Sequence, residues 1–203
     1  FHHYQIVLAG KLLQPEIELI DMWIDLFKID KNQVKRTGYV SDDDLVLLYR
    51  RCALLVFPSL HEGFGLPVLE AMSCGTPVIG SNITSIPEII GIKKAMFDPN
   101  NVSEIRDLII KALSDNQFKE ELLINARIQS NKFSWKKTAL KAIEACQQIS
   151  GGISKEQDLI SWQDILNDRT KKFKDLIQLI NVNRAFKRDF NEKICVLIAS
   201  SLE

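Results

Sequence analysis

Two glutamates and two glycines stand close together in one segment of the chain and could bind a polar ligand. Glu62 and Glu70 have seven residues between them, and Gly63 and Gly65 lie just before Pro67, which is expected to start a helix. Glycines let the backbone approach a ligand closely and adopt positive φ, and the free N–H groups of a helix N-terminus bind an anion such as a phosphate. Carboxylates accept hydrogen bonds from hydroxyl groups, as the acidic residue of dinucleotide-binding folds does from a ribose. The segment therefore predicts a site for a nucleotide-type ligand.

Each of these residues also has a simpler interpretation. A glutamate in the first turns of a helix often only complements the helix dipole, and glycines are common in tight turns. The combination at a junction between a strand and a helix favours the ligand site, because open α/β sheets bind ligands at the carboxyl ends of their strands.

The segments around this motif alternate between apolar runs and helical patterns. Apolar runs predict buried strands over residues 4–10 and 53–57, and further short strands are predicted over residues 34–40, 76–80 and near 95–97. Apolar residues at helical spacing predict helices over residues 15–28, after a cap at Ser41, and over residues 67–73. This alternation predicts a parallel sheet covered by helices on both faces, which is the α/β fold class. Trp23 and Trp135 lie on apolar helical faces and are expected in the core.

The C-terminal part of the sequence changes in character. The pattern is helical from residue 102 to a Gly-Gly break after residue 150, so we expect a first domain over residues 1–150. Residues 151–192 are predicted to be a basic helical linker, since residues 169–188 hold seven Lys or Arg and one acid. A solvated helix is favoured there, and peripheral membrane association through anionic lipid is the alternative. Residues 193–203 predict the first strand of a truncated following domain, which could also pair with a neighbouring copy to form an oligomer.

The composition excludes several classes of protein. The 203 residues carry 26 Lys and Arg against 26 Asp and Glu, so the net charge gives no argument for nucleic acid as a partner. The four cysteines form no C-x-x-C pair and have no histidine at zinc spacing, which predicts reduced thiols, a cytoplasmic location and no metal site. No apolar run approaches the roughly 20 residues of a membrane helix. The absence of an initiator Met and the strand predicted at the very start indicate a fragment.

The motif and its surroundings resemble the retaining glycosyltransferases of family 4, also called group 1, which have the two-domain GT-B fold. The shared segments are EGFGLPVLEAM, CGTPVI, SIPEI, TGYVS, FDP and FSW. They cover residues 4–149 in the order found in the C-terminal, donor-binding domain of that family. The resemblance implies a Rossmann-like parallel sheet flanked by helices, the C-terminal half of a GT-B fold, followed by a helical extension.

The resemblance also implies roles for individual residues. Glu62 would be catalytic, contacting the hydroxyls of the donor sugar and stabilising the developing oxocarbenium charge, and Glu70 would hold the ribose diol. The backbone N–H groups that would reach the sugar or diphosphate belong to Gly63, Phe64, Gly65 and Leu66. The residues that would flank the base are Gly38, Tyr39 and Val40. The family uses a nucleotide-diphosphate sugar as donor substrate, with no other cofactor and no obligatory metal.

Two parts of the fold of this family are expected to be missing from this chain. One is the first β-α unit of the donor domain, with the Arg and Lys that neutralise the diphosphate, and the other is the N-terminal domain that binds the acceptor. The implied full-length protein is a bacterial hexosyltransferase of surface polysaccharide synthesis, located in the cytoplasm at the inner face of the membrane. It would move a sugar, with mannose as one candidate, to a glycan or lipid-linked acceptor, whereas the isolated chain is expected to be inactive. The alternative is a non-catalytic Rossmann-like binding or scaffold module of a multidomain protein.

Overall fold

The computed structural model describes residues 4–149 and 194–198 of the chain. The chain forms two compact units, of which the first comprises Phe1–Lys132 together with Asn191–Glu203 and the second comprises Phe133–Phe190. The first unit therefore ends earlier in the sequence than expected, because the last helix of the predicted domain is grouped with the second unit. The predicted basic linker lies outside the described residues.

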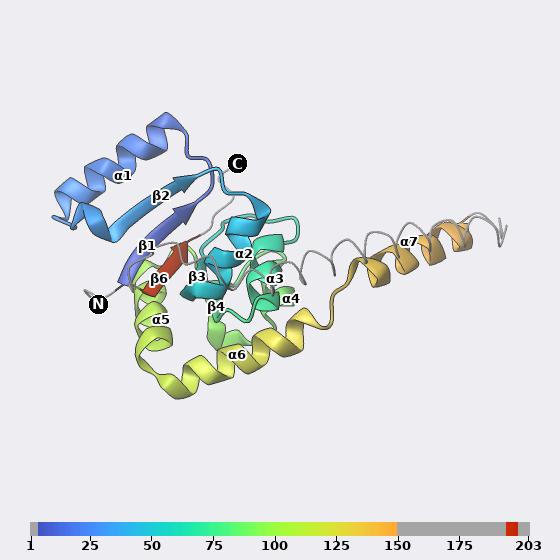
Figure 1. Cartoon of the computed structure of the whole chain (residues 1–203). Coiled ribbons are helices and arrows are strands. Elements are labelled where there is room, and N and C mark those ends of the chain that lie inside the picture. Colours follow the sequence, from blue (N-terminus) through green and yellow to red (C-terminus); the bar gives the residue numbers. More distant parts are fainter. Residues whose placement is uncertain (1–3, 150–193, 199–203) are drawn as a thin grey trace. The chain divides into compact units, whose positions relative to one another are not determined.

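Six parallel strands form one sheet in the first unit (Figure 1). The strands are β1 Tyr4–Ala9, β2 Val34–Gly38, β3 Cys52–Phe57, β4 Val78–Ser81, β5 Met96–Phe97 and β6 Ile194–Ile198. Their order across the sheet is β2-β1-β6-β3-β4-β5, and every pair of neighbours is parallel. Since the strands are parallel, their carboxyl ends meet at one edge of the sheet, which is where doubly wound α/β folds bind ligands.

Helices link successive strands and extend the unit after β5. They are α1 Gln14–Leu26, α2 Asp42–Arg51, α3 Leu66–Ser73, α4 Ile86–Ile90, α5 Val102–Ser114 and α6 Asn116–Ser130. The 3₁₀ turns Lys31–Gln33 and Lys93–Ala95 lead into β2 and β5. The α/β class with a parallel sheet flanked by helices is therefore confirmed.

The helix before the central motif shows how local sequence sets these boundaries. The Ser41 hydroxyl accepts a hydrogen bond from the N–H of Asp44 at 3.3 Å and caps α2, as expected. Acidic residues fill the first turn of α2 and arginines the last, so both ends complement the helix dipole. β3 follows directly, and each of its six residues is buried, as a strand covered on both faces requires.

The position of β6 differs from the expectation that it opens a following domain. Its backbone pairs on one side with β1, where Tyr4 lies opposite Ile194, and on the other side with β3, where Leu55 lies opposite Leu197. Without β6, the facing edges of β1 and β3 would each leave a row of backbone N–H and C=O groups unpaired. A parallel strand between them satisfies both edges, and local sequence patterns contain no signal for such a distant pairing.

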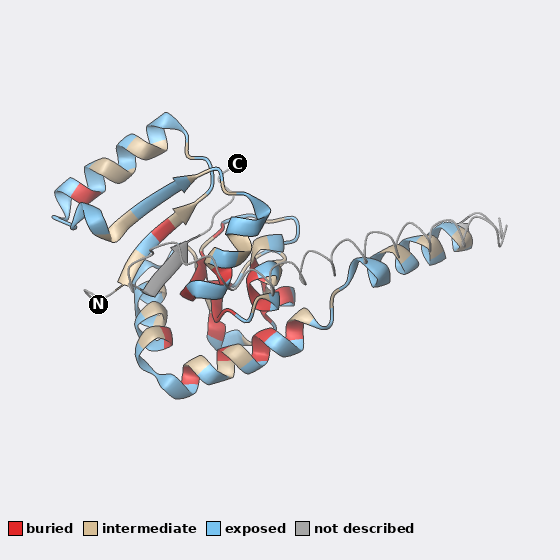
Figure 2. Ribbon diagram, viewed as in Figure 1, coloured by how far each residue is buried: buried red, intermediate tan, exposed pale blue. Residues whose placement is uncertain are grey.

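The strands at one end of the sheet are more deeply buried than the strands at the other end, as the colours of Figure 2 show. We call β3, β4 and β5, with α3, α4 and α6, the closed half, and we call β1, β2 and α1, together with the C-cap of α1 at Phe27, the open half. Every residue of β3 and β4 is buried, whereas Val7 is the one buried residue of β1 and none of β2 is buried. Of α1, Ile24 alone is buried, while Trp23 is 46% exposed. The expectation of a core position for Trp23 is therefore wrong.

The described part of the second unit is one helix, α7 Trp135–Ile149. Its first turn is stabilised by Ser134, whose hydroxyl accepts a hydrogen bond from the N–H of Lys137 at 3.1 Å. Trp135 is 74% exposed, so it is not a core residue as expected. Within residues 4–149 and 194–198, no helix is both long and apolar enough to cross a membrane.

Candidate functional site

The predicted glycine motif forms the loop between β3 and α3, at the carboxyl edge of the sheet. Glu62 in this loop is half-buried, and Gly63 and Phe64 are exposed. Leu66 opens α3, and Glu70 lies further along the same helix with its side chain exposed. The structure thus places the segment at the strand-to-helix junction that the sequence predicted.

Serine hydroxyls hold the glycine loop in place by donating hydrogen bonds to its backbone carbonyl oxygens. The Ser85 hydroxyl, at the start of α4, donates to the carbonyl oxygens of Glu62 at 3.1 Å and Phe64 at 2.8 Å. Ser59 is buried, and its hydroxyl donates to the carbonyl oxygen of His61 at 3.0 Å. Because three of its carbonyl oxygens accept these hydrogen bonds, the loop has a fixed shape before any ligand binds.

The two glycines of the loop serve different purposes. Gly65 has a φ of 97° and caps α3, and a Cβ atom there would lie 2.6 Å from Cδ1 of Ile86. Both the backbone conformation and the packing therefore favour glycine at this position. Gly63 does not have positive φ, and a Cβ atom there would meet no atom within 4 Å. The expectation of positive φ is confirmed for Gly65 and wrong for Gly63.

Glu70 contacts a residue that the sequence did not point to. The hydroxyl of Tyr49, in α2, donates a hydrogen bond to Oε2 of Glu70 at 3.2 Å. Burial, and secondarily the Glu70 carboxylate beside it, raise the pKa of Tyr49 well above its usual value of 10.0. The Tyr49 hydroxyl thus remains protonated and remains a donor at neutral pH. One oxygen of the exposed Glu70 carboxylate is therefore hydrogen-bonded to a buried residue.

The turn after β2 lies at the same edge of the sheet as the glycine loop. Gly38 has a φ of 66° and its carbonyl oxygen accepts the N–H of Gly10 at 3.2 Å. Tyr39 is 87% exposed and Val40 is half-buried. Two strands separate β2 from β3, so this turn stands about 14 Å from the glycine loop along the edge, by the usual spacing of strands. The two segments therefore share an edge without adjoining each other.

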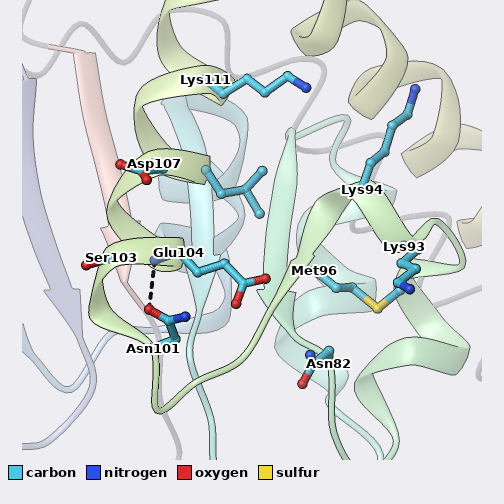
Figure 3. Close-up of a pocket in the computed structure, with 10 residues that line it drawn as sticks. Asn82, Lys93, Lys94, Met96, Asn101, Ser103, Glu104, Asp107 and Lys111 are labelled. Atoms are coloured by element: carbon cyan, nitrogen blue, oxygen red, sulfur yellow. Dashed lines mark hydrogen bonds between the residues drawn. The ribbon is translucent and has the colours of Figure 1, made fainter.

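A hollow of about 860 Å³ opens elsewhere on the first unit, between α5 and the β4-β5 edge (Figure 3). Its charged lining residues are Lys93, Lys94, Glu104, Asp107 and Lys111. Several of these already have local partners: Lys94 pairs with Glu121, and Lys111 lies over the ring of Phe118. None of the predicted site residues lines this hollow, so the chemistry of the glycine loop identifies the better candidate.

Two other kinds of site, a metal centre and a reactive thiol, find no support among the described residues. No group of three or more His, Cys, Asp or Glu placed to bind a metal ion occurs among residues 4–149 and 194–198. Burial raises the pKa of the Cys74 thiol although Arg50 acts in the opposite direction, which disfavours a nucleophilic thiolate.

Two supporting residues were not assigned a role from the sequence. Tyr49 was visible only as one member of an apolar helical face, and Ser85 only as part of a shared segment. Both act through hydrogen bonds to residues more than 20 positions away, so spacing alone could not reveal them.

Comparison with known proteins identifies relatives of this chain. Residues 2–129 match the family profile described as "Glycosyl transferases group 1". The chain is 44% identical over 181 residues, 89% of its length, to the "Serotype-specific mannosyltransferase WbdA" of Escherichia coli, of which it spans 22%. It is 43% identical over 112 residues to the "O-antigen chain mannosyltransferase B" of the same species, covering 55% of this chain and 29% of that protein.

A solved structure shows the same fold. Alr3699/HepE of Anabaena, crystallised in complex with UDP and glucose, matches with a TM-score of 0.63 at 24% sequence identity, over 71% of this chain and 40% of that chain. The expected half of a GT-B fold is thereby confirmed. The chain spans between about a fifth and a third of the length of the curated relatives named above. Because the family profile matches well over half of its residues, the chain belongs to the group 1 glycosyltransferase family.

Proposed function

We propose that this chain is the donor-binding half of a retaining glycosyltransferase that takes a sugar from a nucleotide-diphosphate sugar. The observation that carries the proposal is the fixed glycine loop at the carboxyl edge of the sheet, with Glu62 in the loop and Glu70 in the helix behind it. The names of the matched Escherichia coli proteins support mannose as the sugar and O-antigen, a surface polysaccharide, as the product. The proposed acceptor is a glycan or a lipid-linked acceptor.

The geometry supports separate roles for the residues of the loop. Glu62 is proposed to contact the sugar and to stabilise positive charge at the reacting carbon, and Glu70 to accept hydrogen bonds from the ribose diol. Gly63 supports close approach of a ligand, because neither its conformation nor its packing requires glycine. The N–H groups from Gly63 to Leu66 would face the sugar or the diphosphate, and the Gly38–Val40 turn would flank the base further along the edge.

The open half supports the expectation that a first β-α unit is missing from the donor domain. β1 has strands on both sides, yet Ile6 is 36% exposed and Leu8 only half-buried. α1 likewise leaves Met22, Trp23 and Phe27 between 46% and 68% exposed. Apolar surface of this kind on a parallel sheet is normally covered by a further helix. A preceding β-α unit would supply such a helix.

The isolated chain is proposed to bind the donor weakly and to transfer no sugar. Loss of two charge-assisted contacts to the diphosphate, at about 1.5–3 kcal/mol each, weakens binding by roughly 10²- to 10⁴-fold. The domain that binds the acceptor is also expected to belong to a longer protein, so the isolated chain would have no acceptor site. Metal-independent transfer, a cytoplasmic location and peripheral membrane association remain predictions.

A calorimetric titration of the chain with UDP, GDP and ADP tests the proposal. We expect weak, saturable binding of one nucleotide, with an affinity at least tenfold lower for Glu70→Ala. Glu120→Ala is the matched control, because Glu120 is an exposed glutamate of α6 to which the proposal gives no role, and its affinity should equal that of the wild type. Absence of binding up to about 10 mM, or equal binding by Glu70→Ala, would contradict the proposal.

A further inference from the structure

Tyr49, in α2, links the buried core to the exposed carboxylate of Glu70. Its residue is 2% exposed, yet its hydroxyl reaches Oε2 of Glu70 at 3.2 Å. The two residues come from neighbouring helices, α2 and α3, so the contact depends on the packing of these helices and not on local sequence.

The backbone of Tyr49 is itself fixed from two sides. The hydroxyl of Thr76 donates to the Tyr49 carbonyl oxygen at 2.5 Å, and the thiol of Cys52 donates to the same oxygen at 3.3 Å. Thr76 and Cys52 are both buried. Because the ring is buried and its backbone is anchored, the position of the hydroxyl is set by the fold.

A glutamate on a helix surface is otherwise free to choose among several side-chain conformations, and fixing it for a ligand costs conformational entropy. A carboxylate can accept several hydrogen bonds, so an oxygen held by a phenol leaves the second oxygen available to a ligand. A tether of this kind removes part of the ordering cost before the ligand arrives.

We propose that Tyr49 is a positioning residue, which holds one oxygen of Glu70 so that the other is presented to the hydroxyl groups of the nucleotide ribose. The inference rests on the proposed function, since Glu70 is the residue proposed to bind the ribose. Tyr49 acts through Glu70 and does not touch the ligand.

The test compares each nucleoside diphosphate with its 2′,3′-dideoxy form, which lacks the diol. In the wild-type chain we expect the natural nucleotide to bind more tightly than the dideoxy form. Tyr49→Phe keeps the ring and removes the hydroxyl, and we expect it to lower the affinity for the natural nucleotide about tenfold while leaving that for the dideoxy form unchanged. A merely structural role would weaken binding of both forms equally.

Two further variants separate the possible failures. Thr76→Val removes the buried hydrogen bond behind Tyr49 but keeps the phenol, so it should retain the discrimination between the two nucleotides even where it lowers stability. Glu70→Ala removes the acceptor and should lose that discrimination. If Glu70→Ala retains it, the proposed role of Glu70 fails; if Glu70→Ala loses it while Tyr49→Phe retains it, the role of Tyr49 is overturned.

A measurement without ligand decides the question independently of affinity. Side-chain coupling constants of Glu70 from NMR should show one conformation in the wild type and averaged conformations in Tyr49→Phe. Identical, averaged couplings in both proteins would show that Tyr49 does not position Glu70, even if the chain bound no nucleotide.

Discussion

The two halves of the sheet are buried to different degrees. In the closed half, Phe57 and Phe97 are completely buried, and the helices α3, α4 and α6 pack against one another. In the open half, Phe27 is 68% exposed and most of β1 is only half-buried. The glycine loop and Glu70 belong to the half whose packing is complete within the described residues, so the candidate site is fixed by a well-packed frame.

The largest expected difference between the halves comes from matched phenylalanine substitutions. Phe57→Ala should lower the free energy of unfolding by about 3–5 kcal/mol, because it leaves a cavity in a fully packed strand. Phe27→Ala in the open half should change it by no more than about 0.5 kcal/mol, since little buried surface is lost. Urea unfolding measures both. Similar losses in the two variants would remove the distinction between the halves.

A proline in β6 tests how the halves are joined. Val196→Pro removes a backbone donor from a strand with neighbours on both sides and should cost about 2–3 kcal/mol. Amide hydrogen exchange should become faster in β1 and β2 and remain slow in β4, which keeps its partner β3. Unchanged exchange in β1 would mean that β6 does not hold this position.

Alanine substitutions of the two loop glycines should change the free energy of unfolding by less than Phe57→Ala and Val196→Pro do. Gly65→Ala should lower the free energy of unfolding by about 2 kcal/mol, because alanine is strained at positive φ and its Cβ crowds Ile86. Gly63→Ala should stay within about 0.5 kcal/mol of the wild type, since its Cβ meets open space. Thermal unfolding of both variants checks this order, and equal losses would contradict it. In the same titration as above, Gly63→Ala should nevertheless weaken nucleotide binding.

The smallest expected effect lies in the open half, where Asp21 of α1 pairs with Arg36 of β2 at 2.7 Å. The hydrogen bond from Arg36 lowers the pKa of Asp21 below its usual 3.8, so the pair stabilises the fold above that pH and the stabilisation is lost as the pH falls through the lowered pKa. Asp21→Asn should therefore have a slightly lower melting temperature than the wild type at pH 7. The difference should vanish in strong acid, and Arg36→Gln should show the same loss. A difference independent of pH would assign the effect to something other than this charge pair.

The sequence predicted the parts of the fold that depend on neighbouring residues. The cap at Ser41 and the buried run of β3 were found in place because a hydroxyl before acidic residues and a continuous apolar segment each favour one local structure. The glycine loop was placed correctly at a strand-to-helix junction for the same reason.

The misses share a different physical origin. The apolar face of α1 correctly predicted a helix, but periodicity cannot show whether a covering partner is present, so Trp23 was wrongly expected in the core. Gly63 was expected at positive φ because residue type shows what glycine permits and not what the backbone adopts. The Tyr49 contact to Glu70 and the place of β6 both depend on segments brought together by the completed fold.

The central place of β6 has a consequence for biosynthesis. Tyr4 and Ile194 are paired although they lie 190 positions apart in the sequence, and closing so long a loop costs about 5 kcal/mol of chain entropy before the contacts form. A ribosome delivers the other five strands first, so the nascent chain passes through a stage in which the facing edges of β1 and β3 are both unpaired. Such edges can capture strands from other chains. Completion of this sheet must therefore wait until β6 has been synthesised, and folding will be most exposed to aggregation during that interval.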